Sequence, residues 1–285
     1  MDVTFSVLMS VYYRESGKNL DGALESIWTK QTLKPNQIVL VQDGPLTEEL
    51  YYVIEKYKKI CGDVLCTVAL EKNSGLVAAL NKGLEYVTSD IVARMDSDDY
   101  SAFDRFEKQI TFMQHHPLID VLGGSAQEFS ENEECVNIRR YPHVGIKEYI
   151  AKASPVCHAT VMMNMRIFRE GGLKYDSRYH LNEDIALWFD VLRKGYTISN
   201  IDDIIYFVRS DGGMILRRSR VKSKTEFYAY MRGIRDLYGL LTWRYVYPLS
   251  RFIFRMMPPK FIGMIYASKL RTIFLKSDDK TNVEL

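Results

Sequence analysis

Three carboxylates within four positions are the residues of this chain best placed to do chemistry. They are Asp96, Asp98 and Asp99, in the stretch ARMDSDDYS at residues 93–101. In an extended segment alternate side chains share a face, so Asp96 and Asp98 can point the same way while Asp99 points the other. Like charges this close repel unless a cation lies between them. The spacing predicts a site for Mg²⁺ or Mn²⁺, which suits a phosphate-bearing substrate; a solvated acidic turn is the alternative.

The elements that must position these carboxylates alternate between apolar runs and helical patterns. Strands are expected at residues 5–13, 37–41, 64–70 and 91–93, with helices at 19–28, 47–57 and 76–86 between them. This alternation predicts an open α/β sheet with mostly parallel strands. Ligands in such sheets bind beyond the carboxyl ends of the strands. Tyr12, Asp43 and the acidic stretch should therefore converge at one edge.

The second half of the chain has a less regular pattern. Helices are expected at residues 104–115, 184–194 and 227–241, and strands at 121–124, 155–163 and 204–208. The polar segment 128–140 is expected to form a hairpin or loop. His158 is expected to be a structural hydrogen-bonding residue, because the histidines form no pair at metal-ligand spacing.

Composition excludes several classes of protein. The 285 residues are 47% hydrophobic and 26% charged, which is typical of a globular protein. The N-terminus does not resemble a signal peptide, and no run of 18 uncharged apolar residues predicts a transmembrane helix. The four cysteines lack metal-type spacing, so we expect reduced thiols in the cytosol.

Charge divides the chain in two. Residues 217–276 carry a net charge of +12, whereas residues 1–216 carry −8. We therefore expect two regions, 1–216 and 217–285. In 243–275, aromatic and aliphatic residues alternate with Arg and Lys, which is typical of helices lying on a membrane surface. A docking helix for a partner or second subunit is the alternative. No nucleic-acid motif accompanies the charge, so we expect no nucleic-acid partner.

Five stretches together resemble family 2 of the glycosyltransferases, which have a nucleotide-sugar-binding α/β fold called GT-A. They are SVLMSVYYRE from Ser6, VQDGP around Asp43, NSGLVAALNKGL from Asn73, ARMDSDDYS around Asp96 and NEDIALW around Asp184. Their order and spacing match the family over about the first 210 residues. The resemblance implies an open, mostly parallel sheet flanked by helices, followed here by a basic, helical C-terminal tail.

The resemblance implies a nucleotide pocket at the end of the first strand. Val11 and Tyr12 would line it, and Glu15 would reach the ribose. Asp43 matches the aspartate that accepts a hydrogen bond from the uracil ring, although on composition alone it could simply cap a turn. Many relatives carry two aspartates and a serine where this chain has QDGP, so a donor contact is in doubt. Asn73, with Gly75 and Asn81, would shape the pocket from the other side.

The resemblance also implies a metal site. Asp96 and Asp98 match the DxD pair, with Asp98 as the expected direct ligand and Asp96 contacting ribose or metal. Many relatives have a His after the last strand that completes this site. Residues 208–214 contain none, and Asp211 is the available substitute. Arg217 is expected to clamp the diphosphate.

Asp184 matches the catalytic base of the family. At the start of a helix the dipole favours its ionised form, and Glu183 is the rival for the role. The alternative is that Glu183 and Asp184 simply cap the helix. Trp188 lies one turn further on, where it would form either a platform for the acceptor sugar or part of the core.

These features together predict an inverting, metal-dependent transferase that moves a hexose from a UDP-sugar. The basic tail predicts peripheral association with the inner face of the plasma membrane. The acceptor would then be a polyprenyl-diphosphate-linked saccharide used for O-antigen, capsule or exopolysaccharide. A non-catalytic nucleotide-sugar-binding scaffold is the alternative. A nucleotidyltransferase is a third class, but it would normally show a basic glycine-rich loop where this chain has Tyr13 to Gly17.

Overall fold

The computed structural model describes residues 3–130, 137–210 and 220–256. Its strands are β1 (Phe5–Val11), β2 (Gln37–Gln42), β3 (Leu65–Ala69), β4 (Ile91–Met95), β5 (Tyr100–Ser101), β6 (Val121–Phe129), β7 (Ile138–Arg139), β8 (Met162–Asn164) and β9 (Ile198–Arg209). Its α-helices are α1 (Gly17–Ile27), α2 (Glu48–Cys61), α3 (Leu76–Leu84), α4 (Arg105–His115), α5 (Ile146–Tyr149), α6 (Arg166–Arg169), α7 (Glu183–Arg193), α8 (Arg220–Tyr238) and α9 (Val246–Met256).

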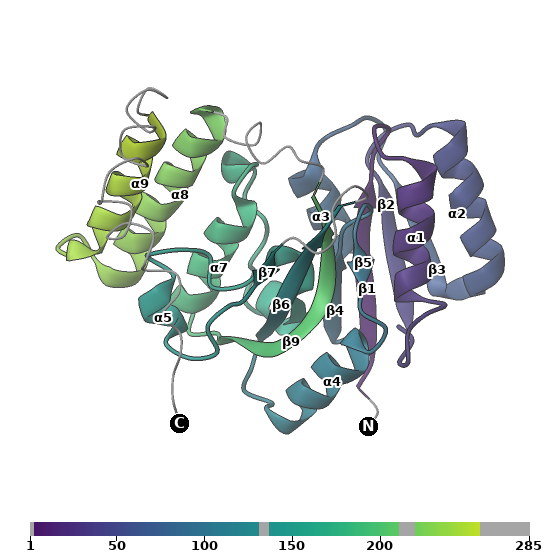
Figure 1. The fold of residues 1–285 in the computed structure, drawn as a ribbon, viewed down its shortest axis with the longest axis horizontal. Helices are drawn as coiled ribbons and strands as arrows, with labels where there is room; N and C mark the ends of the chain where they lie inside the picture. Colours follow the sequence, from purple (N-terminus) through teal and green to yellow (C-terminus); the bar gives the residue numbers. More distant parts are fainter. Residues whose placement is uncertain (1–2, 131–136, 211–219, 257–285) are drawn as a thin grey trace.

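The strands form one mixed sheet in the order β3-β2-β1-β4-β8-β6-β9-β5, with β7 paired to β6 (Figure 1). Strands β3, β2, β1 and β4 are parallel neighbours, and β6 and β9 form a further parallel pair. Val11 lies opposite Gln42, and Met9 lies opposite Met95. The chain therefore leaves β1, β2 and β4 at the same edge, as the alternating pattern predicted.

Helices cover both faces of the sheet because side chains alternate along each buried strand. In β1, Leu8 packs in the core that includes α3, α7 and α8, whereas Val7 and Met9 pack in the core that includes α1, α2 and α4. Figure 1 shows α8 and α9 at the end of the molecule away from α1 and α2. Within the described residues, no helix is both long and apolar enough to cross a bilayer.

Three expectations need correction. Residues 155–163 do not form one strand, because the Thr160 amide and hydroxyl both donate to the carbonyl of Cys157 and turn the chain before β8. Strand β9 is longer than predicted because it pairs along the whole of β6. Helix α8 begins earlier, at Arg220. The division of the chain at residue 216 stays a prediction.

The predicted thiols agree with the structure where it describes them. Cys61, Cys66 and Cys157 are free, and Cys135 lies outside the described residues.

Candidate active site

Asp43 joins the end of β2 to the start of α3. One carboxylate oxygen accepts the amide N–H of Ser74 at 2.6 Å, and the other accepts that of Gly75 at 2.9 Å. Asn73 donates from its side-chain amide to the carbonyl of Asp43 at 3.3 Å. A carboxylate at the first amides of a helix is favourable because those N–H groups lack partners within the helix. Asp43 thus has a structural role, but it binds the amides at the start of α3 rather than capping its own turn before Gly44.

Glycines let α3 lie this close to the sheet. Gly44 has a φ of 85°, and a Cβ there would lie 2.4 Å from the Asn73 nitrogen. A Cβ at Gly83 would lie 2.3 Å from a methyl carbon of Leu8. The spacing of Asn and Gly in this stretch therefore reflects close packing of α3 against β1 and β2, in addition to any contact with a ligand.

We expected Asn81 to help shape the donor pocket, but its side chain binds the backbone of Tyr175. Its side-chain amide donates to the carbonyl of Tyr175 at 2.8 Å and accepts the N–H of Tyr175 at 3.0 Å. The Tyr175 hydroxyl lies 2.9 Å from Nε2 of His158, whose ring packs edge-on against Trp188. These contacts connect α3 to α7, and they support the structural role predicted for His158.

A buried arginine lies beneath the acidic stretch. Arg94 is 3% exposed and forms an ion pair with Asp96. The Asp96 backbone N–H donates to the hydroxyl of Tyr206 at 3.0 Å, which connects β4 to β9. Burial opposes the charged form of Arg94, but the adjacent carboxylate of Asp96 outweighs it and the pKa of Arg94 is raised. The sequence signal for Arg94, a charged residue inside a buried strand, was overlooked.

Arg209 holds both of the other two aspartates, one through its carboxylate and one through its backbone carbonyl. The Asp99 carboxylate accepts the amide N–H of Arg209 at 2.7 Å, while the Arg209 guanidinium donates to the carbonyl of Asp98 at 3.0 Å. Burial and the charge of Asp96 raise the pKa of Asp98 to about 6. Burial and the charges of Asp96 and Asp98 raise the pKa of Asp99 to about 8. Arg209, at the end of β9, was not predicted from the sequence.

This arrangement fits a divalent cation. Mg²⁺ and Mn²⁺ prefer oxygen ligands, and a cation would relieve the repulsion that raises these pKa values. Within residues 3–130, 137–210 and 220–256, no three His, Cys, Asp or Glu side chains form a group able to hold a metal. A cation at Asp96 and Asp98 would therefore draw further ligands from phosphate, from water or from outside these residues. Asp211 lies outside them.

The loop after β1 approaches the acidic stretch. Glu15 accepts from the Ser16 amide and the Asn19 side chain, both at 2.9 Å, and from the Ser97 hydroxyl at 3.4 Å. Its charge contributes to the raised pKa of Asp98. Val11 is buried in β1, whereas the ring of Tyr12 is 41% exposed. The structure thus brings Tyr12, Glu15 and the acidic stretch to one edge, with Asp43 on the neighbouring strand. Arg217 lies outside the described residues.

Two carboxylates begin α7. Glu183 is 7% exposed, and within the described residues its Oε2 has no hydrogen-bond partner. Burial and the charge of Asp184 raise the pKa of Glu183 to about 7. Burial also raises the pKa of Asp184, while the Ile185 amide, which donates to it at 2.8 Å, opposes that shift. Trp188 is fully buried, so the structure favours the core alternative over a platform for a sugar.

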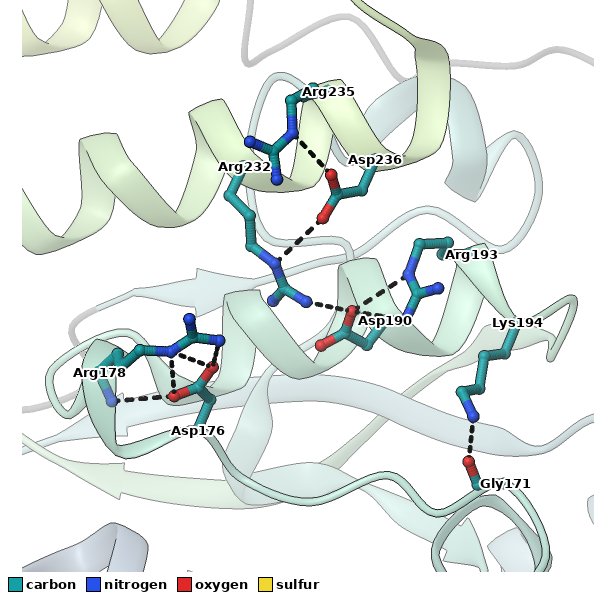
Figure 2. Close-up of polar contacts among 9 residues, drawn as sticks. All are labelled: Gly171, Asp176, Arg178, Asp190, Arg193, Lys194, Arg232, Arg235 and Asp236. Carbon is teal, nitrogen blue, oxygen red and sulfur yellow. Dashed lines mark hydrogen bonds and ion pairs between the residues drawn. The ribbon is translucent and has the colours of Figure 1, made fainter.

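Helix α8 holds α7 in place (Figure 2). Arg232 on α8 donates to Asp190 on α7 at 2.7 Å and to Asp236 on its own helix at 3.2 Å. At the other end of the contact, the Asn182 side chain donates to the Thr225 hydroxyl at 2.8 Å. The two ends of this interface set where the first turn of α7, with its two carboxylates, lies.

Comparison with known proteins finds relatives of this chain among the sugar transferases. Residues 6–172 match the family model described as glycosyl transferase family 2. The chain is 34% identical to an amylovoran biosynthesis glycosyltransferase of Erwinia amylovora over 92% of this chain and 97% of the relative. It is 33% identical to the UDP-Gal:alpha-D-GlcNAc-diphosphoundecaprenol beta-1,3-galactosyltransferase of Escherichia coli, over 94% of this chain and 96% of that protein.

The fold is shared with a solved structure. The crystal structure of S. aureus TarS 1–349 in complex with UDP-GlcNAc superposes with a TM-score of 0.66, covering 99% of this chain and 77% of that one at 20% identity.

Proposed function

The chain belongs to glycosyl transferase family 2 and has the predicted GT-A fold, and we propose that it is an inverting, metal-dependent hexosyltransferase. The donor would be a UDP-sugar of galactose, glucose or an N-acetylhexosamine. One observation carries the proposal. Burial raises the pKa of Asp98 and Asp99 and also of Glu183 and Asp184, and the charge of the buried Arg94 opposes the rise in all four. The acidic stretch and the first turn of α7 therefore both lie within the influence of one buried cation, which supports a donor site and a catalytic base in the same site.

Asp184 is the proposed base. The acceptor hydroxyl must lose its proton as it attacks the anomeric carbon, and a positioned carboxylate that takes this proton contributes roughly 10²–10⁴-fold. A pKa raised by burial makes Asp184 a stronger base than a carboxylate in water. Because the attack is a single displacement, an α-linked donor would yield a β-glycoside.

The remaining carboxylates are proposed to bind the donor. Asp43 would accept from the uracil ring, Glu15 would contact the ribose, and Val11, Tyr12 and Asn73 would line the pocket. Asp96 and Asp98 would hold Mg²⁺ or Mn²⁺, which when bound offsets the charge of the departing nucleoside diphosphate. Arg217 would contact the same diphosphate.

A lipid-linked saccharide in bacterial surface polysaccharide synthesis is the proposed acceptor, like the one named for the Escherichia coli relative. An exposed apolar stripe on α9 supports a position at the membrane surface. Val246, Leu249 and Ile253, at i, i+3 and i+7, are each about half exposed, at 52%, 48% and 49%. Residues 220–256 carry eight basic and two acidic residues, which favours an anionic surface. We propose that α9 lies on the inner face of the plasma membrane.

A panel of UDP-sugars with Mn²⁺, scored for UDP release with and without lipid-linked acceptors, tests the transferase activity. We expect one sugar to be turned over by wild type, with activity lost in Asp98→Ala and strongly reduced in Asp184→Ala. Asp63→Ala, at an exposed turn, is the matched control and should behave as wild type. Thermal shift with each UDP-sugar runs in parallel. Binding of a UDP-sugar without turnover in the presence of any acceptor would favour the scaffold alternative, and a protein that neither binds nor turns over any of these sugars would contradict the proposed donor.

Vesicle sedimentation tests the membrane position. We expect wild type to sediment with vesicles containing anionic lipid, and the Leu249→Ser/Ile253→Ser variant to remain largely in solution. Leu118→Ser is the control. It removes an apolar side chain that is 79% exposed, but this residue lies shortly before β6 and not on α9, so the variant should sediment as wild type. Equal sedimentation of all three proteins would contradict the proposal for α9.

A further inference from the structure

Lys222 lies on the side of α8 that faces α7. It shares a helical stripe with Thr225 and Ala229, at i, i+3 and i+7. Ala229 is fully buried, and the Thr225 hydroxyl accepts from Asn182, immediately before α7. The Lys222 carbonyl accepts from the same Asn182 amide at 3.3 Å. The side chain of Lys222 is nevertheless exposed, because it belongs to the first turn of α8, at the open end of the contact.

The position of Lys222 along α7 is set by contacts at both ends. Arg232, nearly three turns further along α8, pairs with Asp190 at 2.7 Å (Figure 2). Sliding α8 by one turn would break this pair and the bonds from Asn182 together. Lys222 is therefore held at the start of α7, where the charge of its ammonium opposes the raised pKa of both Glu183 and Asp184.

The acceptor proposed above has an anion close to its reactive hydroxyl. In a sugar linked to lipid through a diphosphate, one sugar ring separates the hydroxyl from the first phosphate. Where the acceptor is a single sugar on the diphosphate, as named for the Escherichia coli relative, only one sugar ring lies between the base and the first phosphate when Asp184 accepts that proton. A lysine ammonium is a compact charge that pairs well with phosphate oxygens. Within the described residues, Arg94 and Arg209 beside the acidic stretch are both buried, and they pair with Asp96 and with the carbonyl of Asp98.

We propose that Lys222 binds the diphosphate of the lipid-linked acceptor and so selects diphosphate-linked sugars over neutral glycosides. The inference rests on the proposed function. The diphosphate of the donor is the other anion that Lys222 could bind. The position of Lys222 at the start of α7, close to the proposed base, favours the acceptor.

The test uses the full-length protein and two matched series of acceptors. Each series contains the same hexoses and N-acetylhexosamines on the same short alkyl chain, linked through a diphosphate in one series and directly in the other. The variants are Lys222→Met, which keeps most of the apolar stem, and Lys222→Arg, which keeps the charge. Lys224→Met is the control, because Lys224 is also exposed but lies on a different stripe of α8.

For Lys222→Met we expect the acceptor KM to rise about tenfold with diphosphate-linked sugar, as for loss of one charge-assisted contact. We expect kcat/KM for the neutral glycoside to fall much less, because loss of the charge then acts only through the pKa of Asp184, and we expect the donor KM to stay as in wild type. Lys222→Arg should recover most of the acceptor affinity, and Lys224→Met should match wild type. Equal melting temperatures would show that the variants are folded.

Two results would overturn the assignment. If Lys222→Met lowered kcat/KM equally for both acceptor series, Lys222 would have a structural role. If it raised the donor KM, Lys222 would bind the donor diphosphate instead. Failure of the proposed function has a different signature. Wild type would then transfer sugar to no diphosphate-linked acceptor, and the inference would fall with it.

Discussion

Replacing Asp43 by asparagine separates the structural role of this residue from its proposed role in binding uracil. The two oxygens of the carboxylate each accept one backbone N–H, from Ser74 at 2.6 Å and from Gly75 at 2.9 Å. Asparagine is nearly the same size but has only one acceptor oxygen. Its NH₂ group would face the second backbone N–H, so that two hydrogen-bond donors would point at each other. The negative charge at the start of α3 would also be lost.

The expected cost follows from that geometry. Removing one hydrogen bond to a charged group, and leaving its donor without a partner, costs roughly 1–3 kcal/mol. For a chain of this size each kcal/mol lowers the melting temperature by roughly 2–4 °C. Urea unfolding of Asp43→Asn should therefore show a lower midpoint with an unchanged m-value. Asp63→Asn is the control, because exposed substitutions of this kind usually change stability by less than about 0.5 kcal/mol.

Nucleotide binding supplies the second measurement. A carboxylate that accepts from N3–H of uracil discriminates against cytosine, which has no hydrogen at that position. We expect Asp43→Asn to weaken binding of UDP about tenfold and to leave the weaker binding of CDP nearly unchanged, as measured by calorimetry. Unchanged stability would refute the role given to the two backbone bonds. An unchanged preference for UDP over CDP would refute the contact with uracil.

Three further outcomes are expected. Asp184→Asn should lower kcat by roughly 10²–10⁴-fold with little change in the donor KM, whereas Glu183→Gln should retain most of kcat; the reverse order would make Glu183 the base. The pKa of Glu183 is raised from 4.5 to about 7, so its ionisation opposes folding, and wild type should lose stability on the order of 3 kcal/mol between pH 4.5 and pH 7 relative to Glu183→Gln. If the free energy of unfolding from urea titrations changed equally with pH in the two proteins, the raised pKa of Glu183 would be contradicted. Gly83→Ala places a Cβ 2.3 Å from Leu8 and 2.8 Å from Val41, so it should destabilise the protein by about 1–3 kcal/mol in thermal unfolding. At Gly62 nothing lies within 4 Å of an added Cβ but φ is 57°, so Gly62→Ala measures the cost of backbone strain without a steric clash.

The sequence predicted much of the fold because period and order are local properties. The strands β1 to β4 and the helices between them follow from apolar runs alternating with helical spacing, and parallel pairing then brings their ends to one edge. Tyr12, Asp43 and Asp96 could therefore be placed together without any knowledge of distances. The short strand β5 could not be predicted, and only Met162 and Met163 of β8 fell within the strand expected at 155–163, since these few residues are strands only because longer neighbours pair with them.

Which atoms pair within the site was decided by the tertiary structure. The sequence places three aspartates after β4, but only the packing of β9 against that turn supplies Arg209 to Asp99, and only burial beneath the turn directs Arg94 to Asp96. Asn81 and Tyr175 lie 94 positions apart, and Lys222 is 38 positions from Asp184, so no local pattern connects either pair. Residue types and strand order determine where charges gather, whereas partners, pKa values and the side of the site on which a cation lies depend on burial and on contacts between distant segments.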